Sequence, residues 1–360
     1  MPIVSWIEAG EDRVPEPMAV KPAEGPARSR RPPIHEEPVF DTPGTPARNR
    51  GPAPGDRIGQ FIRETASALG GNTGRAVRSD LGIYAAWCAE EGKRALPAAA
   101  ETVAAFVDAM AKVRAPATVR RYVASIARAH RAVGAGGTVA SPPVKFALKR
   151  MHQSNGRRQD QAHGLTWPLR QRLLETAGAR LIDDRNRALL AVAYDAMLRR
   201  SELTSLKVSD LLEEIGGHGT LLVRCSTTDA EEQGETVWIG PDSMRLVRRW
   251  RERGGVEDGF LFRSLDKGGK PAGALPPGQV ARIFKRMARQ AGLPDSVVRS
   301  LSGQSARVGA AQDMIAAGIE LPAILRAGRW KSTSMVNRYG ERLLAKRSAA
   351  AKLARKQGRK

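Results

Sequence analysis

The chain has 360 residues, enough for about two domains of ordinary size and a tail. Lysine and arginine number 59 against 37 aspartate and glutamate residues, and this surplus of 22 positive charges points to a polyanionic partner. No apolar run approaches the ~20 residues of a membrane helix, and the cysteines Cys88 and Cys225 fit a cytoplasmic protein without disulfides, so we expect no membrane association.

The first segment, residues 1–56, is rich in proline, glutamate, arginine and glycine, and we expect a disordered arm there. Residues 57–152 instead show the apolar spacing of helices. Three apolar stripes carry this pattern: Val77, Leu81, Tyr84 and Cys88; Val103, Phe106, Val107 and Met110; and Val119, Tyr122, Val123, Ile126 and His130. The pattern predicts a helical first domain.

The helix of the third stripe has a second, basic side. Arg120, Arg121, Arg128 and Arg131 lie off the apolar stripe. Such a helix presents one face to a core and the other to an anionic partner, or simply to solvent. Both interpretations remain open at this point.

Residues 153–163 are polar and predict a linker to a second domain over 164–345. In that domain we expect an apolar helix over 185–198 and two strands over 220–225 and 236–239 around a polar tip. Further helices are expected from Pro241, over 280–291, and from Pro322 to Gly328. The fold is therefore predicted to be mostly α with a small β-sheet, followed by a basic, helix-prone tail over 346–360.

Neither a metal nor a nucleotide cofactor is expected, because the five histidines and two cysteines lack ligand spacing and no phosphate-binding glycine loop occurs. Metal-free chemistry on a phosphodiester needs a nucleophile and cationic donors, and arginine is the best such donor. Arg199 in LRRSEL is expected at the end of the apolar helix, held by Glu202 three residues on. Arg307 follows Gln304 by three residues, which predicts one helical face for both.

The last segment of interest contains GRW, with a tyrosine nine residues after Trp330. Three of these residues also fit purely structural roles. Tyr339 shares a helical face with apolar neighbours and fits a core position equally well, Trp330 fits a packing role, and Arg199 fits a simple ion pair with Glu202.

LRRSEL, SGQSARVGAAQDM and GRW with its downstream tyrosine resemble, in this order and spacing, the motifs of the tyrosine recombinase (phage integrase) family, especially its Cre-type branch. The resemblance runs from about residue 57 to about residue 345. It implies a helical core-binding, SAM-like DNA-binding domain over 57–152 and a tyrosine-recombinase catalytic domain over 164–345.

The resemblance also implies roles for individual residues. Arg199 and Arg307 correspond to the family's phosphate-clamping arginines, Trp330 to the His/Trp position of the third motif, and Tyr339 to the nucleophile, while Glu202 would orient Arg199. The family joins its tyrosine to a 3′-phosphate and exchanges strands through a Holliday junction without ATP or metal. The implied partner is double-stranded DNA, bound by a protein that is monomeric in solution and tetrameric on paired sites, with the C-terminal tail docked on a neighbour.

Two positions depart from the family pattern. Gln304 stands where the second motif usually has histidine, and glutamine cannot transfer a proton near neutral pH. The family's hairpin lysine is also missing, since no lysine occurs between Lys207 and Lys267. Thr228 and Arg224 are the nearest substitutes, and neither is a good general acid.

These departures leave several functions open. The first is a site-specific recombinase or integrase of a mobile element, with full or reduced activity; the second is a weakened or inactive DNA-binding relative of the same fold. A type IB topoisomerase-like enzyme shares the arginine and tyrosine chemistry but relaxes supercoils. A helix-turn-helix regulator explains the charge but not the spacing of the three motifs.

Overall fold

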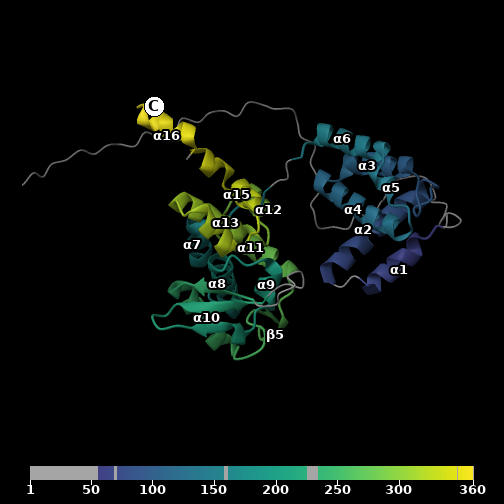
Figure 1. Cartoon of the computed structure of the whole chain (residues 1–360). Coiled ribbons are helices and arrows are strands. Elements are labelled where there is room, and N and C mark those ends of the chain that lie inside the picture. The colour runs from purple at the N-terminus through teal and green to yellow at the C-terminus, as the bar shows by residue number, and fades with distance from the viewer. Residues whose placement is uncertain (1–55, 69–70, 158–160, 225–233, 347, 360) are drawn as a thin grey trace, which may run out of the picture. The chain divides into compact units, whose positions relative to one another are not determined.

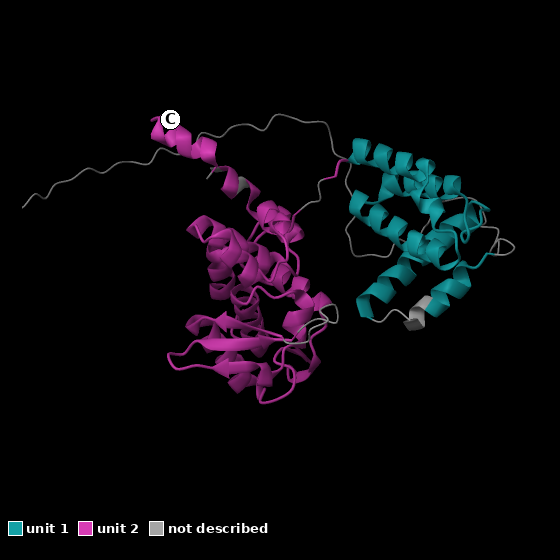
Figure 2. Ribbon diagram, in the orientation of Figure 1, with its two compact units in different colours: residues 1–155 teal, residues 156–360 magenta. Residues whose placement is uncertain are grey.

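The computed structural model describes residues 56–68, 71–157, 161–224, 234–346 and 348–359, divided between two compact units, residues 1–155 and 156–360 (Figures 1 and 2). The arm expected over 1–56 therefore lies, except for Asp56, outside the described residues, as does the tip of the predicted hairpin over 225–233. No helix within the described ranges is long and apolar enough to span a membrane.

Unit 1 is helical where the structure describes it, as the apolar stripes predicted. Its helices are α1 (Ile58–Ala68), α2 (Gly71–Glu90), α3 (Ala100–Val113), α4 (Pro116–Ala132), α5 (Gly137–Ala140) and α6 (Pro142–Asn155). The three stripes lie on α2, α3 and α4 and are buried together, with the Tyr84 and Phe106 rings in edge contact at 4.9 Å. Helix α6 continues to Asn155, three residues into the expected linker, and Asn155 Nδ2 donates to the Ala111 carbonyl at 2.6 Å.

Two buried polar groups fix the helices of unit 1. Asp80 on α2 is fully buried, accepts a hydrogen bond from Ser125 Oγ at 2.8 Å and pairs with Arg121 Nη1 at 2.9 Å, both on α4. His130 is also fully buried: its Nε2 accepts the Ala98 N–H at 3.0 Å, and its Nδ1 lies 2.9 Å from the Ile126 carbonyl. Because buried polar groups are costly without partners, the Asp80 contacts specify how α2 and α4 pack, and the His130 contact holds the segment before α3 against α4.

Unit 2 contains the small sheet that the sequence predicts. Strands β1 (Leu211–Glu213), β2 (Gly219–Val223) and β3 (Glu235–Ile239) pair antiparallel in that order, with Leu221 opposite Val237. The hairpin of β2 and β3 was predicted, with bounds shifted by one or two residues. Strand β1 and the separate pair β4 (Arg263–Leu265) and β5 (Pro271–Ala274) were not, because three or four residues are too short for a visible alternation.

The helices of unit 2 surround a core that contains Trp250, Phe262 and Phe284. They are α7 (Trp167–Glu175), α8 (Leu181–Asp195), α9 (Arg200–Ser205), the 3-10 turn η1 (Val208–Asp210), α10 (Pro241–Gly254), α11 (Gly278–Gln290), α12 (Asp295–Ser300), α13 (Ser305–Ala317), α14 (Leu321–Gly328), α15 (Thr333–Lys346) and α16 (Ala349–Lys356). The predicted helix over 185–198 is wrong at both ends. It begins at Leu181 and ends at Asp195, since Met197 adopts a left-handed φ of 48° that a helix cannot continue through.

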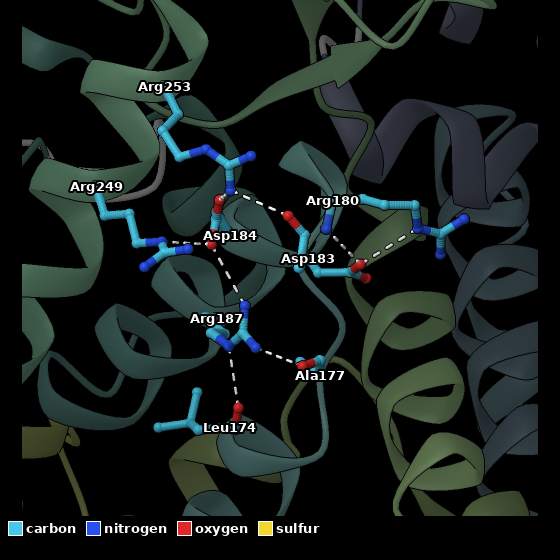
Figure 3. A network of polar contacts seen from close by, with 9 residues as sticks. Leu174, Ala177, Arg180, Asp183, Asp184, Arg187, Arg249 and Arg253 are labelled. Atoms are coloured by element: carbon cyan, nitrogen blue, oxygen red, sulfur yellow. Dashed lines mark hydrogen bonds and ion pairs between the residues drawn. The ribbon is translucent and has the colours of Figure 1, made fainter.

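A network of arginines fastens α8 to α10 (Figure 3). Asp184 on α8 is buried. It accepts hydrogen bonds from Arg187 Nη1 at 3.3 Å and from Arg249 Nε at 2.9 Å, and it also pairs with Arg253. Arg249 and Arg253 come from α10, whereas Arg187 lies one turn along α8. The network therefore sets the position of α8, whose C-terminal end leads into Arg199.

Candidate active site

Arg199 is held in place by Glu202. Instead of ending the apolar helix, as the sequence suggested, Arg199 is the N-terminal cap of the next helix, α9, with extended backbone angles of −69° and 151°. One Glu202 oxygen accepts the Arg199 backbone N–H at 2.9 Å and the other contacts its guanidinium at 2.5 Å. The Arg199 side chain is still 47% exposed, so its guanidinium has room for a further anionic ligand.

Glu202 is an ionised carboxylate inside a basic environment. Burial raises the pKa of its carboxyl, but the hydrogen bonds from Arg199 and the charge of Arg329 outweigh burial and hold the pKa below its usual value. Glu202 is therefore ionised at neutral pH. In this form it accepts hydrogen bonds from Arg199, which orients the guanidinium, and it has no proton to donate.

Arg307 is a buried cation that forms no ion pair with any carboxylate in the described part of the chain. It lies in the first turn of α13 and is 3% exposed; its Nη1 donates to the Met197 carbonyl at 3.1 Å and its Nη2 to the Gly328 carbonyl. Burial, together with the nearby charges of Arg199 and Arg329, lowers the pKa of Arg307 to about 10. It stays protonated at neutral pH, so this region carries excess positive charge, which suits a phosphate.

Trp330 connects Arg307 to Tyr339. The Arg307 guanidinium carbon lies 4.5 Å from the centre of the Trp330 ring, and the Tyr339 ring meets the same indole edge-on at 5.8 Å. Helix α15 carries Tyr339 and packs closely on α13: a Cβ on Gly340 would lie 2.4 Å from Ile315 Cδ1, so a larger residue there would require the Ile315 side chain to move. Gln312 Nε2 also donates to the Tyr339 carbonyl at 3.2 Å.

Of the four tyrosines, Tyr339 has the hydroxyl best placed for chemistry. Tyr84 and Tyr122 are buried in the core of unit 1. The Tyr194 hydroxyl donates to Asp313 Oδ2 at 2.5 Å, and burial together with this hydrogen bond raises its pKa. The half-buried Tyr339 makes no hydroxyl hydrogen bond to any residue that the structure describes; burial raises its pKa, and the charges of Arg307 and Arg338 oppose that rise.

Gln304 lies beside this group but not within the helix that carries Arg307. It is the N-terminal cap of α13, with helical backbone angles, and its carbonyl accepts the Val308 N–H at 2.9 Å, so the helix itself begins one residue later, at Ser305. Its N–H donates to Ser302 Oγ at 3.1 Å, and its half-buried side-chain amide makes no hydrogen bond within the described part of the chain. The amide is thus available to a ligand as a hydrogen-bond donor.

The other candidate residues that the structure describes have different partners. Arg224 donates through Nε to Asp210 Oδ1 at 2.8 Å, which raises the Arg224 pKa, and Thr228 falls outside the described residues. On α4 of unit 1, Arg120, Arg128 and Arg131 are exposed, whereas Arg121 pairs with Asp80 and lies over the Tyr122 ring at 5.5 Å. Arg121 is therefore partly structural.

The structure adds Arg329, which the sequence predictions omitted. Its guanidinium is close to buried, at 9% exposure, and Nη2 donates to Glu202 Oε2 at 2.8 Å. A visible signal existed: a long cationic side chain directly follows the glycine that ends a helix and precedes Trp330. Within the described residues, no three His, Cys, Asp or Glu side chains are placed to hold a metal ion.

Comparisons with known proteins cover the same region. A model of the phage integrase family matches residues 170–344, which span Arg199 to Tyr339. Recombinase Cre of Escherichia phage P1 is 29% identical over 304 residues, 79% of this chain and 88% of Cre. The fold resembles the Tn1549 transposon integrase in complex with circular intermediate DNA (TM-score 0.56, 15% identity, 78% of this chain and 94% of that chain). It also resembles a lambda integrase tetramer bound to a Holliday junction (TM-score 0.55, 16% identity, 78% and 75%).

Proposed function

Because the chain belongs to the tyrosine recombinase (phage integrase) family, we propose that it is a site-specific DNA recombinase of a mobile element that works through a 3′-phosphotyrosyl intermediate. The observation that carries the proposal is the contact series from Arg307 through Trp330 to Tyr339, with Arg199 and Glu202 at the same centre. In this series, cationic donors lie near a tyrosine whose hydroxyl makes no hydrogen bond to any residue that the structure describes.

The chemistry follows from these side chains. Arg199 and Arg307 bind the non-bridging oxygens of the scissile phosphate and stabilise the charge that grows there during attack. The Tyr339 oxygen forms a bond to phosphorus while the bond to the 5′-oxygen breaks, and that oxygen takes up a proton. The phosphodiester energy is kept in the phosphotyrosine, so the reverse step, by a 5′-hydroxyl of the partner duplex, needs no further energy source.

Proton transfer is the step for which this site is least well equipped. The pKa of Tyr339 is raised, so its hydroxyl must lose a proton as it attacks, and the leaving 5′-oxygen must gain one. Gln304 can donate a hydrogen bond to the phosphate but supplies neither proton. A missing proton-transfer group typically costs about 10²-fold to 10⁴-fold in rate, so we propose slow strand cleavage, or cleavage completed by a partner protein.

Unit 1 contributes to DNA binding in this proposal. The exposed Arg120, Arg128 and Arg131 on α4 supply phosphate contacts, and the overall charge of +22 favours association with a polyanion. By analogy with the lambda integrase tetramer, we propose four copies on paired sites, with the tail over 346–360 docked on a neighbouring copy. We propose that the protein acts in the cytoplasm, where reducing conditions keep the buried Cys88 as a free thiol.

A second candidate is a DNA-binding relative with weakened or absent catalysis. Gln304 and the absence of lysine between Lys207 and Lys267 favour it, since each leaves out a group that could transfer a proton while the arginines proposed to bind DNA remain. The two candidates share the fold and the basic surface, and they differ only in whether Tyr339 reacts.

A suicide-substrate assay separates them. Duplexes from the ends of the element, nicked so that cleavage releases a short strand, are incubated with wild type, Tyr339→Phe and the matched control Tyr194→Phe. Recombinase function predicts a denaturation-resistant protein–DNA band with wild type and Tyr194→Phe but not with Tyr339→Phe. Site-specific binding without any band favours the non-catalytic relative.

A further inference from the structure

Arg329 adopts a backbone conformation that arginine does not favour. It caps the C-terminus of α14 with φ 52° and ψ 48°, in the left-handed region where glycine is the usual residue. Its Cβ makes that conformation unfavourable, so the side chain must gain contacts that compensate for it. Met197, the other non-glycine residue with positive φ within the described chain, is one of its contacts.

The Arg329 side chain reaches three separate elements. Its Nη1 donates to the Ala196 carbonyl at 3.0 Å, and its Nη2 lies 3.4 Å from the Met197 carbonyl, both in the turn between α8 and α9. Nη2 also donates to Glu202 on α9, and Nε lies 3.6 Å from Glu235 on β3. A single guanidinium therefore joins the start of the segment that carries Tyr339 to the turn that carries Arg199.

The shared acceptors tie the two catalytic arginines to this contact. The Glu202 carboxylate that holds Arg199 is the one that Arg329 binds, and the Met197 carbonyl accepts from Arg307 as well. Without Arg329, Glu202 would keep one cationic partner and the Met197 carbonyl one donor. The turn between α8 and α9 would then be held less firmly on one side.

We propose that Arg329 is a positioning residue that aligns the Arg199–Glu202 pair and the Met197 turn with Trp330 and Tyr339. In this alignment, Arg199, Arg307 and the Tyr339 hydroxyl contact the same phosphate. This inference rests on the proposed recombinase function. Arg329 itself does not contact the reacting atoms in this account. It acts through Glu202 and the carbonyls. Its planar fork matters more than its charge, because Nη1 reaches the Ala196 carbonyl while Nη2 reaches Glu202, a fixed spacing that the compact ammonium of lysine does not reproduce.

The test compares Arg329→Gly, Arg329→Lys and a control, Arg326→Ala, which removes an exposed arginine from the same helix. Glycine suits the left-handed position, so loss of function in Arg329→Gly does not arise from backbone strain. For each variant the single-turnover rate of adduct formation at saturating DNA and the Kd for the site are measured. In parallel, amide hydrogen exchange of free protein follows the peptide over residues 196–205.

We expect adduct formation by Arg329→Gly to fall about 10-fold to 100-fold with Kd within about twofold of wild type, the pattern of misplaced catalytic groups. Arg329→Lys should not restore the rate, Arg326→Ala should match wild type, and exchange over 196–205 should accelerate in both Arg329 variants only. A wild-type rate in Arg329→Gly, an equal loss in Arg326→Ala, or unchanged exchange over 196–205 overturns the inference.

The exchange measurement also separates this inference from the proposed function. If wild type forms no adduct, the recombinase proposal fails, and exchange in free protein still shows whether Arg329 orders the turn. Faster exchange over 196–205 in Arg329→Gly supports the positioning role even then, whereas unchanged exchange refutes it.

Discussion

The guanidinium of Arg307 lies over the indole of Trp330, 4.5 Å from the ring centre, and this indole also touches Tyr339. An aromatic face attracts a cation without neutralising it as a carboxylate would. Arg307 thus keeps its full charge in a buried position, where a charge interacts more strongly than in water. Trp330 sets the spacing between that charge and the proposed nucleophile.

The first prediction concerns the shape of the Arg199 side chain. Arg199→Lys keeps the charge but loses the planar fork, so it cannot bind Glu202 and a phosphate as arginine does. We expect adduct formation to slow by at least about 10²-fold, as for loss of one transition-state donor, with a much smaller change in Kd. Arg200→Lys, the exposed neighbour, is the control. An equal effect of both substitutions would contradict the role of Arg199.

Gln304→His tests whether proton transfer limits the reaction. Histidine has a pKa near 6.5 and can exchange a proton at working pH, so we expect adduct formation to accelerate by about 10-fold or more. The rate should also gain a pH dependence between about 6 and 7 that wild type lacks. Gln304→Ala controls for the loss of the amide. If the histidine variant is no faster than wild type, a missing proton-transfer group at position 304 does not limit the rate of adduct formation.

The basic side of α4 is tested by salt dependence. Arg120→Gln, Arg128→Gln and Arg131→Gln should each weaken DNA binding and lower the slope of log K against log salt by about one per lost phosphate contact. Arg121→Gln should affect thermal stability more than the slope, because Arg121 pairs with the buried Asp80. Identical slopes for wild type and all the variants would show that α4 presents this face to solvent only.

Acid should destabilise unit 1 through His130. Burial lowers the pKa of His130, and its Nε2 accepts the Ala98 N–H, so the folded state holds the neutral ring. Because the folded pKa lies below the unfolded value near 6.5, the unfolded state binds more protons in this window. Stability from His130 is complete above pH 6.5 and is lost as pH falls through its folded pKa. Thermal unfolding between about pH 7 and 5 should show a steeper loss for wild type than for His130→Gln; parallel curves would contradict this.

Much of the fold follows from local sequence patterns. The stripes on α2, α3 and α4 were predictable because helical spacing puts their apolar residues on one side, and all are buried. Helix ends were harder to predict. The end of α8 depends on a left-handed Met197, whose carbonyl is held by two arginines from distant segments, and a local pattern does not contain such contacts.

The candidate site was predictable only as a set of motifs. Spacing and resemblance singled out Arg199, Arg307, Trp330 and Tyr339, and the structure brings them together, but their roles remain proposals. Arg329 was missed because its partners, Glu202 and two carbonyls, lie more than a hundred residues away. The sequence of residues 321–330 does not indicate which distant groups Arg329 contacts.

The decisive measurement is to identify the residue that becomes linked to DNA. After reaction with the suicide substrate, nuclease and protease digestion leaves a nucleotide on one peptide, and tandem mass spectrometry locates it. We expect a phosphodiester on Tyr339 and on none of the other three tyrosines, Tyr84, Tyr122 and Tyr194. Attachment to another residue, or no adduct despite site-specific binding, would contradict it.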